Sequence, residues 1–474
     1  MCLQITTCLW QESHAQTIFK GEFTMARQIT MKLIPALFLV VFSGAASASG
    51  FQLLEQGSGL GNAFAGSAAK ANDASTIFWN PAGMTQLQAR EVSGGLTAVR
   101  PSFKFNDKGS QVGVFSAGGP ALAGDGGDAG SWAVIPNGYL SWALNKDLYI
   151  GVGIGAPFGN ATKYDKPWRG SAQSDEFDIE TININPSIAY RVNEKVSLGA
   201  GFSWQKINAD YYRQVAVGPL PTPVGTLALP QVRSHMSISD DAWGWNIGAL
   251  FTVSPSTKVG LSYRSTVQFH TDGTVKLQGD GTTAGNATAA VLSSSNPVVG
   301  GRASDVKADL KVPDTFIASV TQQLSDRWEM LGDVSWTGWS SIQNVDIIRT
   351  SGVQDGKSAQ VLKAKFDDTW RVALGANYKY TDAIKFMFGI AYDQTPVKNS
   401  TTRLTSLPDN DRTWFTVGTQ WKPAKEQTLE LGAAYLYIPK TKINQNETAE
   451  GRGTVYGDYD SSVWILGAQY SLAF

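Results

Sequence analysis

The amino-acid sequence predicts an all-β protein, a 14-stranded antiparallel transmembrane β-barrel with a small helical N-terminal hatch that plugs the lumen. Three observations carry this prediction. Segments of period-two alternation recur along the chain, aromatic residues gather at their ends, and the connections between them alternate between short and long. Lipid-facing and lumen-facing residues alternate in outer-membrane barrels, aromatic girdles mark both interfaces, and the short turns are periplasmic.

The composition of the 474-residue chain fits this class. Only 17% of the residues are charged, 11% are aromatic and 49 are glycines, whereas soluble domains have roughly 25% charged residues and about 7% glycine. The 39 basic and 40 acidic residues nearly cancel. The chain therefore has no basic excess to neutralise a phosphate backbone, which argues against nucleic acid as a partner.

Residues 1–48 are expected to be absent from the mature protein. Lys32, the apolar run 33–42 and the small residues that end at Ala48 form the three regions of a signal peptide. The apolar run is too short to span a bilayer. We therefore expect cleavage after Ala48.

The upstream extension, residues 1–24, has no export character, which suggests that the true start is Met25 or Met31. Both cysteines, Cys2 and Cys8, lie in this extension. The expected mature chain therefore contains no cysteine.

Residues 49–90 do not alternate and are expected to form the hatch. They consist of Ala-rich pieces interrupted by Gly57, Gly59 and Asn80-Pro81, which predicts short helices. Roughly 40 residues cannot form a core of their own. The barrel lumen is the only large surface against which this segment could be buried.

Residues 91–474 are expected to form the barrel. Turn spacing and alternation place strands near 92–106, 131–145, 147–161, 177–193, 195–213, 238–254, 257–275, 306–324, 327–345, 364–380, 383–397, 411–423, 427–441 and 456–474. An even number of strands brings both ends to the periplasmic side. The last strand ends at Phe474, where we expect the barrel-assembly machinery to bind. A soluble sandwich or propeller shares the alternation and is the alternative fold.

Several motifs closely resemble the FadL-type outer-membrane transporters of long-chain fatty acids and related hydrophobic compounds. These motifs are Ser49-Gly50-Phe51-Gln52-Leu53, Ser58-Gly59-Leu60-Gly61, Asn80-Pro81-Ala82, Tyr263-Arg264-Ser265, the runs 370–375 and 393–397, and the run 407–414. The resemblance covers essentially all of residues 49–474. It implies a hatch that includes Gly50, Asn80, Pro81 and Ala82, and a monomer that takes up hydrophobic small molecules through the outer membrane of a Gram-negative bacterium, among its lipid and lipopolysaccharide.

A long-chain fatty acid requires an apolar pocket with one or two cations, because its carboxylate needs a charge-assisted donor in a partly dry lumen. The candidate cations are those that alternation or strand position brings to the lumen: Arg264, Arg371, Lys385, Lys206 and Arg213. The resemblance adds Phe51, because the N-terminal segment of the family lies beside the ligand. The alternative role of each cation is an ion pair with a lumen carboxylate or with the hatch.

The run 215–230, VAVGPLPTPVGTLALP, is a candidate capture loop. Exposed apolar runs of this density often mark binding surfaces. The apolar side chains that we assign to capture are Leu220, Val224, Leu227 and Leu229. A loop that only packs on its neighbours is the alternative.

The third strand is a candidate exit. It contains Gly155, Pro157, Phe158 and Gly159, and because proline cannot donate to a ladder and glycine favours bulges, we expect a kink there. A kinked wall would release an apolar ligand sideways into the membrane, and the resemblance implies such a kink. A kink that only eases barrel curvature is the alternative.

Other function classes stay open. Neutral aromatic or aliphatic hydrocarbons suit the same route, and a polar diffusion porin or an adhesive surface barrel would share the wall. An enzyme is disfavoured, because the mature chain has only His235 and His270 and no G-x-S-x-G element. The sequence predicts no cofactor and no metal site.

Overall fold

The computed structural model describes residues 50–112, 124–215, 220–222, 225–227, 232–297 and 300–474. The expected signal peptide and its upstream extension lie outside the described residues. Within the described part of the chain, no helix is long and apolar enough to cross a membrane.

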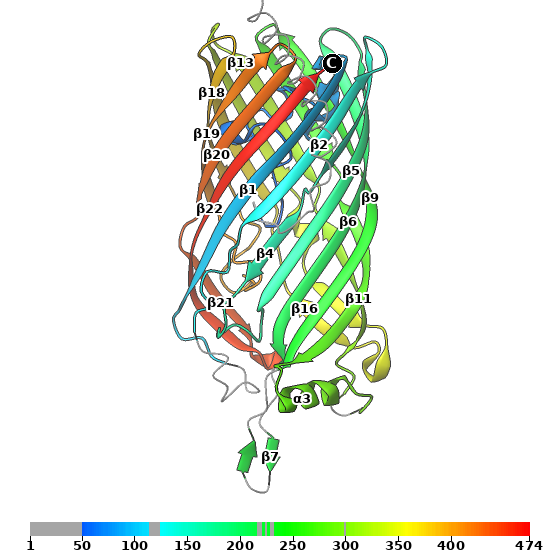
Figure 1. The fold of residues 1–474 in the computed structure, drawn as a ribbon, viewed down its shortest axis with the longest axis vertical. Coiled ribbons are helices and arrows are strands. Elements are labelled where there is room, and N and C mark those ends of the chain that lie inside the picture. Colours follow the sequence, from blue (N-terminus) through cyan, green and yellow to red (C-terminus); the bar gives the residue numbers. More distant parts are fainter. Residues whose placement is uncertain (1–49, 113–123, 216–219, 223–224, 228–231, 298–299) are drawn as a thin grey trace, which may run out of the picture. The chain divides into compact units, whose positions relative to one another are not determined.

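The chain forms a closed 14-stranded antiparallel β-barrel, as predicted (Figure 1). Eight strands of the wall are continuous: β1 (Arg90–Asp107), β2 (Ala133–Ala143), β5 (Glu176–Arg191), β6 (Val196–Val215), β9 (Val232–Ser254), β18 (Ile384–Asp393), β19 (Arg412–Ala424) and β22 (Gly453–Ala473). The others are divided in two: β3 (Leu148–Gly155) with β4 (Gly159–Lys163), β10 (Thr257–Arg264) with β11 (Val267–Gly279), β12 (Ser304–Val312) with β13 (Thr315–Gln323), β14 (Trp328–Thr337) with β15 (Val345–Arg349), β16 (Ser358–Leu362) with β17 (Thr369–Lys379), and β20 (Gln427–Tyr437) with β21 (Thr441–Glu447). β1 pairs with β22 from Glu91 to Asp107 and closes the barrel.

Helices are short and lie outside the wall ladder. They are η2 (Leu60–Asn62), α2 (Thr76–Trp79), η3 (Pro81–Gln86), α3 (Thr283–Ser293), η6 (Trp339–Ser341), η7 (Gly352–Gln354) and η8 (Thr448–Glu450). A separate hairpin is formed by β7 (Leu220–Thr222) and β8 (Gly225–Leu227).

Burial alternates along the wall strands, as a membrane barrel requires. On β22, for example, Trp464 and Leu466 are exposed, whereas Val463 and Ile465 between them are buried. Exposed aromatic rings such as Trp370 and Tyr437 lie at the ends of β17 and β20 away from the short turns, and the exposed Trp243 lies at the middle of the longer β9. The outward face therefore matches a bilayer with an aromatic interface.

Residues 50–89 form the hatch and lie in the half of the lumen near the short turns. Lumen-facing glycines admit its backbone: a Cβ on Gly248 would lie 2.0 Å from Oδ1 of Asn80, and one on Gly260 would lie 1.9 Å from the carbonyl oxygen of Ala68. The Asn80 amide donates to the carbonyl oxygens of Ala68 and Ala249 at 2.7 and 2.9 Å, and its oxygen accepts from the Ala82 N–H. Asn80, followed by Pro81 at the start of η3, thus fastens the hatch to the wall.

The other half of the lumen is apolar. Buried side chains from β6, β9, β11, β12, β15 and the loops above them pack into one group, here called the outer-lumen cluster; it includes Ile207, Tyr211, Ile238, Phe269, Val306 and Trp339. A hatch hydrogen-bonded to the wall below and an apolar cluster above divide the lumen along the barrel axis.

Candidate ligand-binding site

The third wall strand is interrupted where the sequence predicted a kink. β3 ends at Gly155 and β4 begins at Gly159, and the pairing of each with β5 differs in register by one residue. β2 pairs with β3 no further than Gly138 opposite Ile154, and within the described residues β4 forms a strand ladder only with β5. At the far end of β4, a single backbone hydrogen bond joins the Lys163 N–H to the Ala129 carbonyl oxygen, ahead of β2. The wall ladder is therefore open between β2 and β4.

The hatch occupies this open edge. The Leu53 N–H donates to the Pro157 carbonyl oxygen at 2.8 Å, and the Gly159 N–H donates to the carbonyl oxygen of Phe51 at 2.7 Å. Gln52 lies directly opposite Phe158. Residues 51–53 thus act as a short strand in the position that β2 leaves vacant.

Gln56 strengthens the same junction. Its buried side-chain oxygen accepts from the Ala156 N–H at 2.9 Å, and its amide nitrogen donates to the Ala156 carbonyl oxygen at 2.7 Å. The Tyr139 hydroxyl donates to the carbonyl oxygen of Gln56 at 2.6 Å. The backbone groups of Ala156, Pro157 and Gly159 that the kink frees bond to the hatch, whereas those of Phe158 bond to Thr181 on β5, so hatch and gap form one hydrogen-bonded unit.

Phe51 lies where the hatch meets the outer-lumen cluster. Its ring centroid is 4.8 Å from that of Trp339 and 5.8 Å from that of Phe158. The preceding Gly50 donates its N–H to Oδ2 of Asp409 at 3.0 Å and adopts a positive φ of 62° against the Trp339 ring. The predicted ligand contact and the predicted exit therefore share one aromatic cluster.

Arg213 lies at the far end of the apolar lumen. It follows Ile207, Ala209 and Tyr211 on the inward face of β6. Together with Arg302 and Arg349 it lines a cavity of about 400 Å³, partly open to solvent, whose other walls are mostly apolar.

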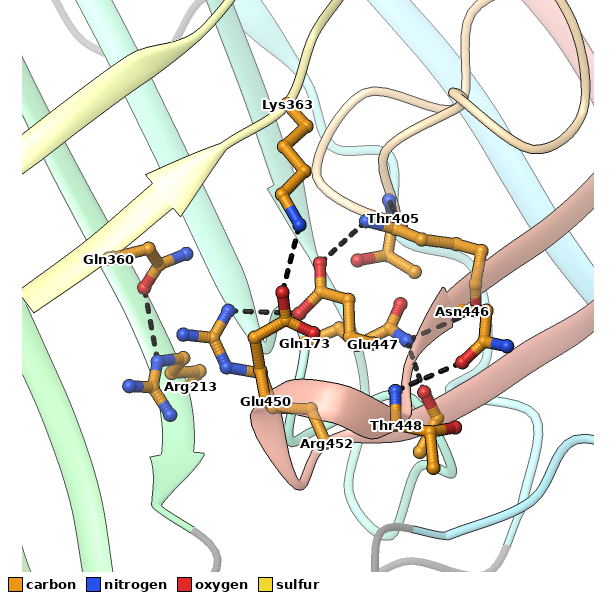
Figure 2. Close-up of polar contacts among 12 residues, drawn as sticks. Gln173, Arg213, Gln360, Lys363, Thr405, Asn446, Glu447, Thr448, Glu450 and Arg452 are labelled. Atoms are coloured by element: carbon orange, nitrogen blue, oxygen red, sulfur yellow. Dashed lines mark hydrogen bonds and ion pairs between the residues drawn. The ribbon is translucent and has the colours of Figure 1, made fainter.

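The three arginines of this cavity have no carboxylate partner among the described residues. Nε of Arg213 donates to Oε1 of Gln360 at 3.1 Å, as Figure 2 shows, and Arg349 donates to the carbonyl oxygen of Arg302 and to Oγ of Ser304. Guanidinium groups that lack a counter-ion in an apolar cavity can bind a ligand carboxylate.

The nearby carboxylates are already paired with other cations (Figure 2). Glu447 accepts from Arg452 at 2.9 Å, and Glu450 accepts from Lys363 at 2.9 Å. The Glu450–Lys363 hydrogen bond lowers the pKa of Glu450 and raises the pKa of Lys363, so both stay charged. These pairs leave Arg213 available.

Arg264 and Arg371 hold the hatch. Arg264 donates to the carbonyl oxygen of Phe78 at 2.9 Å and lies 4.3 Å from the centroid of its ring. Arg371 donates to the carbonyl oxygen of Ala63 at 2.5 Å and faces Asp333 and Asp393. Both line a second cavity at the hatch, with about 840 Å³ between protein atoms, and their contacts match the alternative role that the sequence left open.

Two predicted cations do not reach the apolar lumen. Lys206 is exposed on the outward face of β6, because it lies seven positions, an odd offset, before the inward Arg213; its assignment to the ligand site is therefore corrected. Lys385 lies near a short turn, in an open cavity with Lys379 and Glu329.

The capture loop is only partly described. Leu220 in β7 pairs with Leu227 in β8 across the hairpin, whereas Val224 and Leu229 lie outside the described residues. Arg302, Arg349 and Gln56 were not predicted. Alternation along its strand places Arg349 on the lumen face, so this residue could have been predicted from the sequence. No local sequence pattern marks Gln56.

The fold and the site define a plugged outer-membrane β-barrel with an apolar lumen that ends in cations. The chain belongs to the outer membrane protein transport protein family (OMPP1/FadL/TodX), whose model matches residues 39–474.

The chain is 27% identical to the long-chain fatty acid transport protein of Escherichia coli K12, over 93% of this chain and 97% of that protein. It is 30% identical to a 47 kDa outer membrane protein of Pasteurella multocida, over 88% and 95% of the two chains. The crystal structure of a Pseudomonas aeruginosa FadL homologue superposes with a TM-score of 0.79 at 23% identity, over 90% and 99%. The Ralstonia pickettii toluene transporter TbuX shares the fold at a TM-score of 0.59 and 16% identity, over 89% and 99%.

Proposed function

We propose that this protein takes up long-chain fatty acids passively through the outer membrane. The observation that carries the proposal is the apolar outer lumen with three arginines at its solvent end, which have no carboxylate partner among the described residues. An acyl chain fits the outer-lumen cluster, and its carboxylate pairs with Arg213. Relatives named long-chain fatty acid transport proteins support the same cargo.

The route begins at the apolar capture loop around Leu220 and Leu227. The acid then enters the outer-lumen cluster with its tail toward Phe51. Displacement of Phe51 pulls residues 51–53 from the open edge of β4, because the backbone of the same residues holds that edge. The apolar cargo leaves between β2 and β4 into the membrane, without crossing water.

The test compares oleate with a neutral hydrocarbon, hexadecane, on purified protein. A hydrogen bond to a charged group contributes about 1.5–3 kcal/mol, so Arg213→Gln is expected to weaken oleate binding roughly tenfold or more and to leave hexadecane binding unchanged. Lys206→Gln is the matched control, because it removes a cation from the outward face of the same strand. Equal losses of affinity for both ligands, or no loss for oleate, would contradict the proposal that Arg213 binds the ligand carboxylate.

Uptake of neutral hydrocarbons by the same route is the second candidate. The apolar cluster accepts them equally well, and structural neighbours include toluene transporters. The unpaired arginines favour an acid, because burial of cations against an apolar cargo gains nothing and costs desolvation. A polar porin would need a hydrated lumen, which an apolar outer half above a hydrogen-bonded hatch does not offer.

A further inference from the structure

A group of cations lies on the outside of the barrel, away from the lumen site. Alternation on β1 turns Arg100 and Lys104 outward, and Lys108 follows directly after the strand. Lys440 and Lys442 lie beside them, at the start of β21, which pairs with β22. We call these five side chains the outer-wall cationic patch.

The height of the patch is fixed by the aromatic girdle. Arg100 is paired with Trp464, whose ring centroid lies 4.9 Å from that of Tyr435. Lys104 is paired with Asp460, four residues further from the short turns, which at about 3.3 Å per residue places it roughly 13 Å along the strand. The patch therefore begins at the outer interface and continues above it.

Below the patch, the same strands are apolar. Leu96 and Leu466 are exposed on the outward faces of β1 and β22, and Val134 is exposed on β2. Hydrocarbon-facing, aromatic and cationic levels thus follow one another along a single part of the wall.

The cations of the patch outnumber its carboxylates. Lys108 and Lys440 share Asp458, Lys440 also pairs with Asp460, and Arg100 pairs with Asp128. Lys104 and Lys442 form no ion pair within the described part of the chain and are exposed. The neighbouring residues 113–123, which lie outside the described part, contain no charged residue.

Another part of the wall has more outward carboxylates than cations. Outward carboxylates on β5, β6, β11 and β12 include Asp178, Glu180, Asp210, Asp272, Asp305 and Asp309. The outward cations of these strands are Lys206, Lys276, Lys307 and Lys311. The positive patch is therefore a local feature and does not follow the net charge of the chain.

We propose that the outer-wall cationic patch binds the phosphate groups of lipid A, the membrane anchor of lipopolysaccharide, in the outer leaflet. Lipid A carries phosphates above several acyl chains, and this order matches cations above an aromatic girdle above Leu96, Val134 and Leu466. Within the described residues, the ammonium groups of Lys104 and Lys442 have no ion-pair partner and are available to the phosphates. Lys108 and Lys440 share the carboxylate of Asp458, and each of the two side chains remains more than half exposed. The inference does not depend on the cargo of the lumen.

The experiment measures lipid A binding to the purified full-length barrel by native mass spectrometry. Removal of three cations weakens the attraction to the lipid phosphates, so the triple variant Lys104→Gln, Lys108→Gln, Lys442→Gln is expected to bind diphosphoryl lipid A at least about tenfold more weakly. The matched control is Lys276→Gln, Lys307→Gln, Lys311→Gln, which removes three outward cations from the acidic wall and should change binding little.

A second arm separates phosphate recognition from acyl-chain adsorption. Wild-type protein should prefer diphosphoryl lipid A over its dephosphorylated form, and inorganic phosphate at the same concentration should not compete. All substituted lysines are exposed, so both triple variants should keep the heat-modifiable electrophoretic mobility of a folded barrel. Equal binding by the two triple variants, or equal binding of both lipid forms, would overturn the proposal.

Discussion

Single residues with the same charge serve different purposes in this lumen, and their partners distinguish them. In the part of the chain that the structure describes, Arg213 donates hydrogen bonds to the neutral acceptors of Gln360 and Gln214 and forms no ion pair, whereas Arg371 donates to the hatch at Ala63 and faces Asp333 and Asp393. A ligand carboxylate would add a counter-ion at Arg213 but would have to displace protein partners at Arg371. We therefore assign cargo recognition to the first and hatch anchoring to the second.

This assignment predicts the behaviour of Arg371→Met. Removal of one partner from a buried charge network costs about 3–5 kcal/mol, so the hatch should become less stable. Deuterium exchange should rise at residues 60–68, and oleate and hexadecane binding should change by the same factor. A selective loss of oleate binding, with unchanged deuterium exchange in the hatch, would contradict this assignment and show that Arg371 binds the ligand carboxylate.

Glu55 predicts a pH dependence of the hatch. Burial raises the pKa of this carboxyl from 4.5 to about 7, against the opposing charges of Arg371 and Arg412. Because the folded hatch holds the proton more tightly than the opened hatch, its stability is complete below about pH 4.5 and falls as the pH rises through 7.

Deuterium exchange of residues 54–57, corrected for the intrinsic pH effect, should therefore increase between pH 5 and pH 7. Glu55→Gln, which imitates the protonated form, should remove this dependence. A wild-type hatch equally protected at both pH values would contradict the prediction.

At the scale of elements, the junction between residues 51–53 and β4 joins ligand binding to wall opening. Gln52 and Phe158 form the bridge pair, and the flanking backbone hydrogen bonds run from Leu53 to Pro157 and from Gly159 to Phe51. Such a non-hydrogen-bonded pair has the shorter Cα separation of an antiparallel ladder, which suits a disulfide.

We therefore predict that the double variant Gln52→Cys, Phe158→Cys, oxidised across this pair, loses oleate uptake and recovers it on reduction. Oleate binding at Arg213 should persist in both states, because that cavity lies at the other end of the lumen. Each single cysteine variant is a control, since the expected mature chain has no cysteine of its own. Full uptake by the oxidised form would show that the hatch strand need not leave β4.

The sequence predicted elements better than contacts, for physical reasons. Alternation is a local property of each strand, so the 14 strands and the interruption near Pro157 could be derived without a structure. Alternation through Ile207 and Tyr211 also places Arg213 on the inward face and Lys206 on the outward face of the same strand. The partners of Arg371 and Gln56 lie about 308 and 100 residues away in the chain, and no local pattern encodes contacts over such separations.

On the scale of the whole molecule, polarity changes along the barrel axis both inside and outside. Inside, an apolar outer half ends at cations and rests on a hatch that is hydrogen-bonded to the wall. Outside, apolar strand faces end at an aromatic girdle, and charged residues follow above it. The chain has few charged residues and nearly equal numbers of basic and acidic ones. These charges are nevertheless grouped locally, at the arginine-lined cavity in the lumen and at the outer-wall cationic patch.

A barrel closed in this way should not conduct ions steadily. The hatch is held to the wall by Asp333, which accepts from the N–H groups of Gly66 and Ser67 at 3.1 and 3.3 Å and from the Ser67 hydroxyl at 2.8 Å. In planar bilayers, wild-type protein should show little conductance, whereas Asp333→Ala should show frequent brief openings, because several buried donors lose their acceptor at once. Asp382→Ala, which removes an exposed carboxylate at a short turn, should resemble wild type. A large and steady wild-type conductance would instead indicate a water-filled diffusion pore, and the apolar lumen would then need another explanation than fatty acid transport.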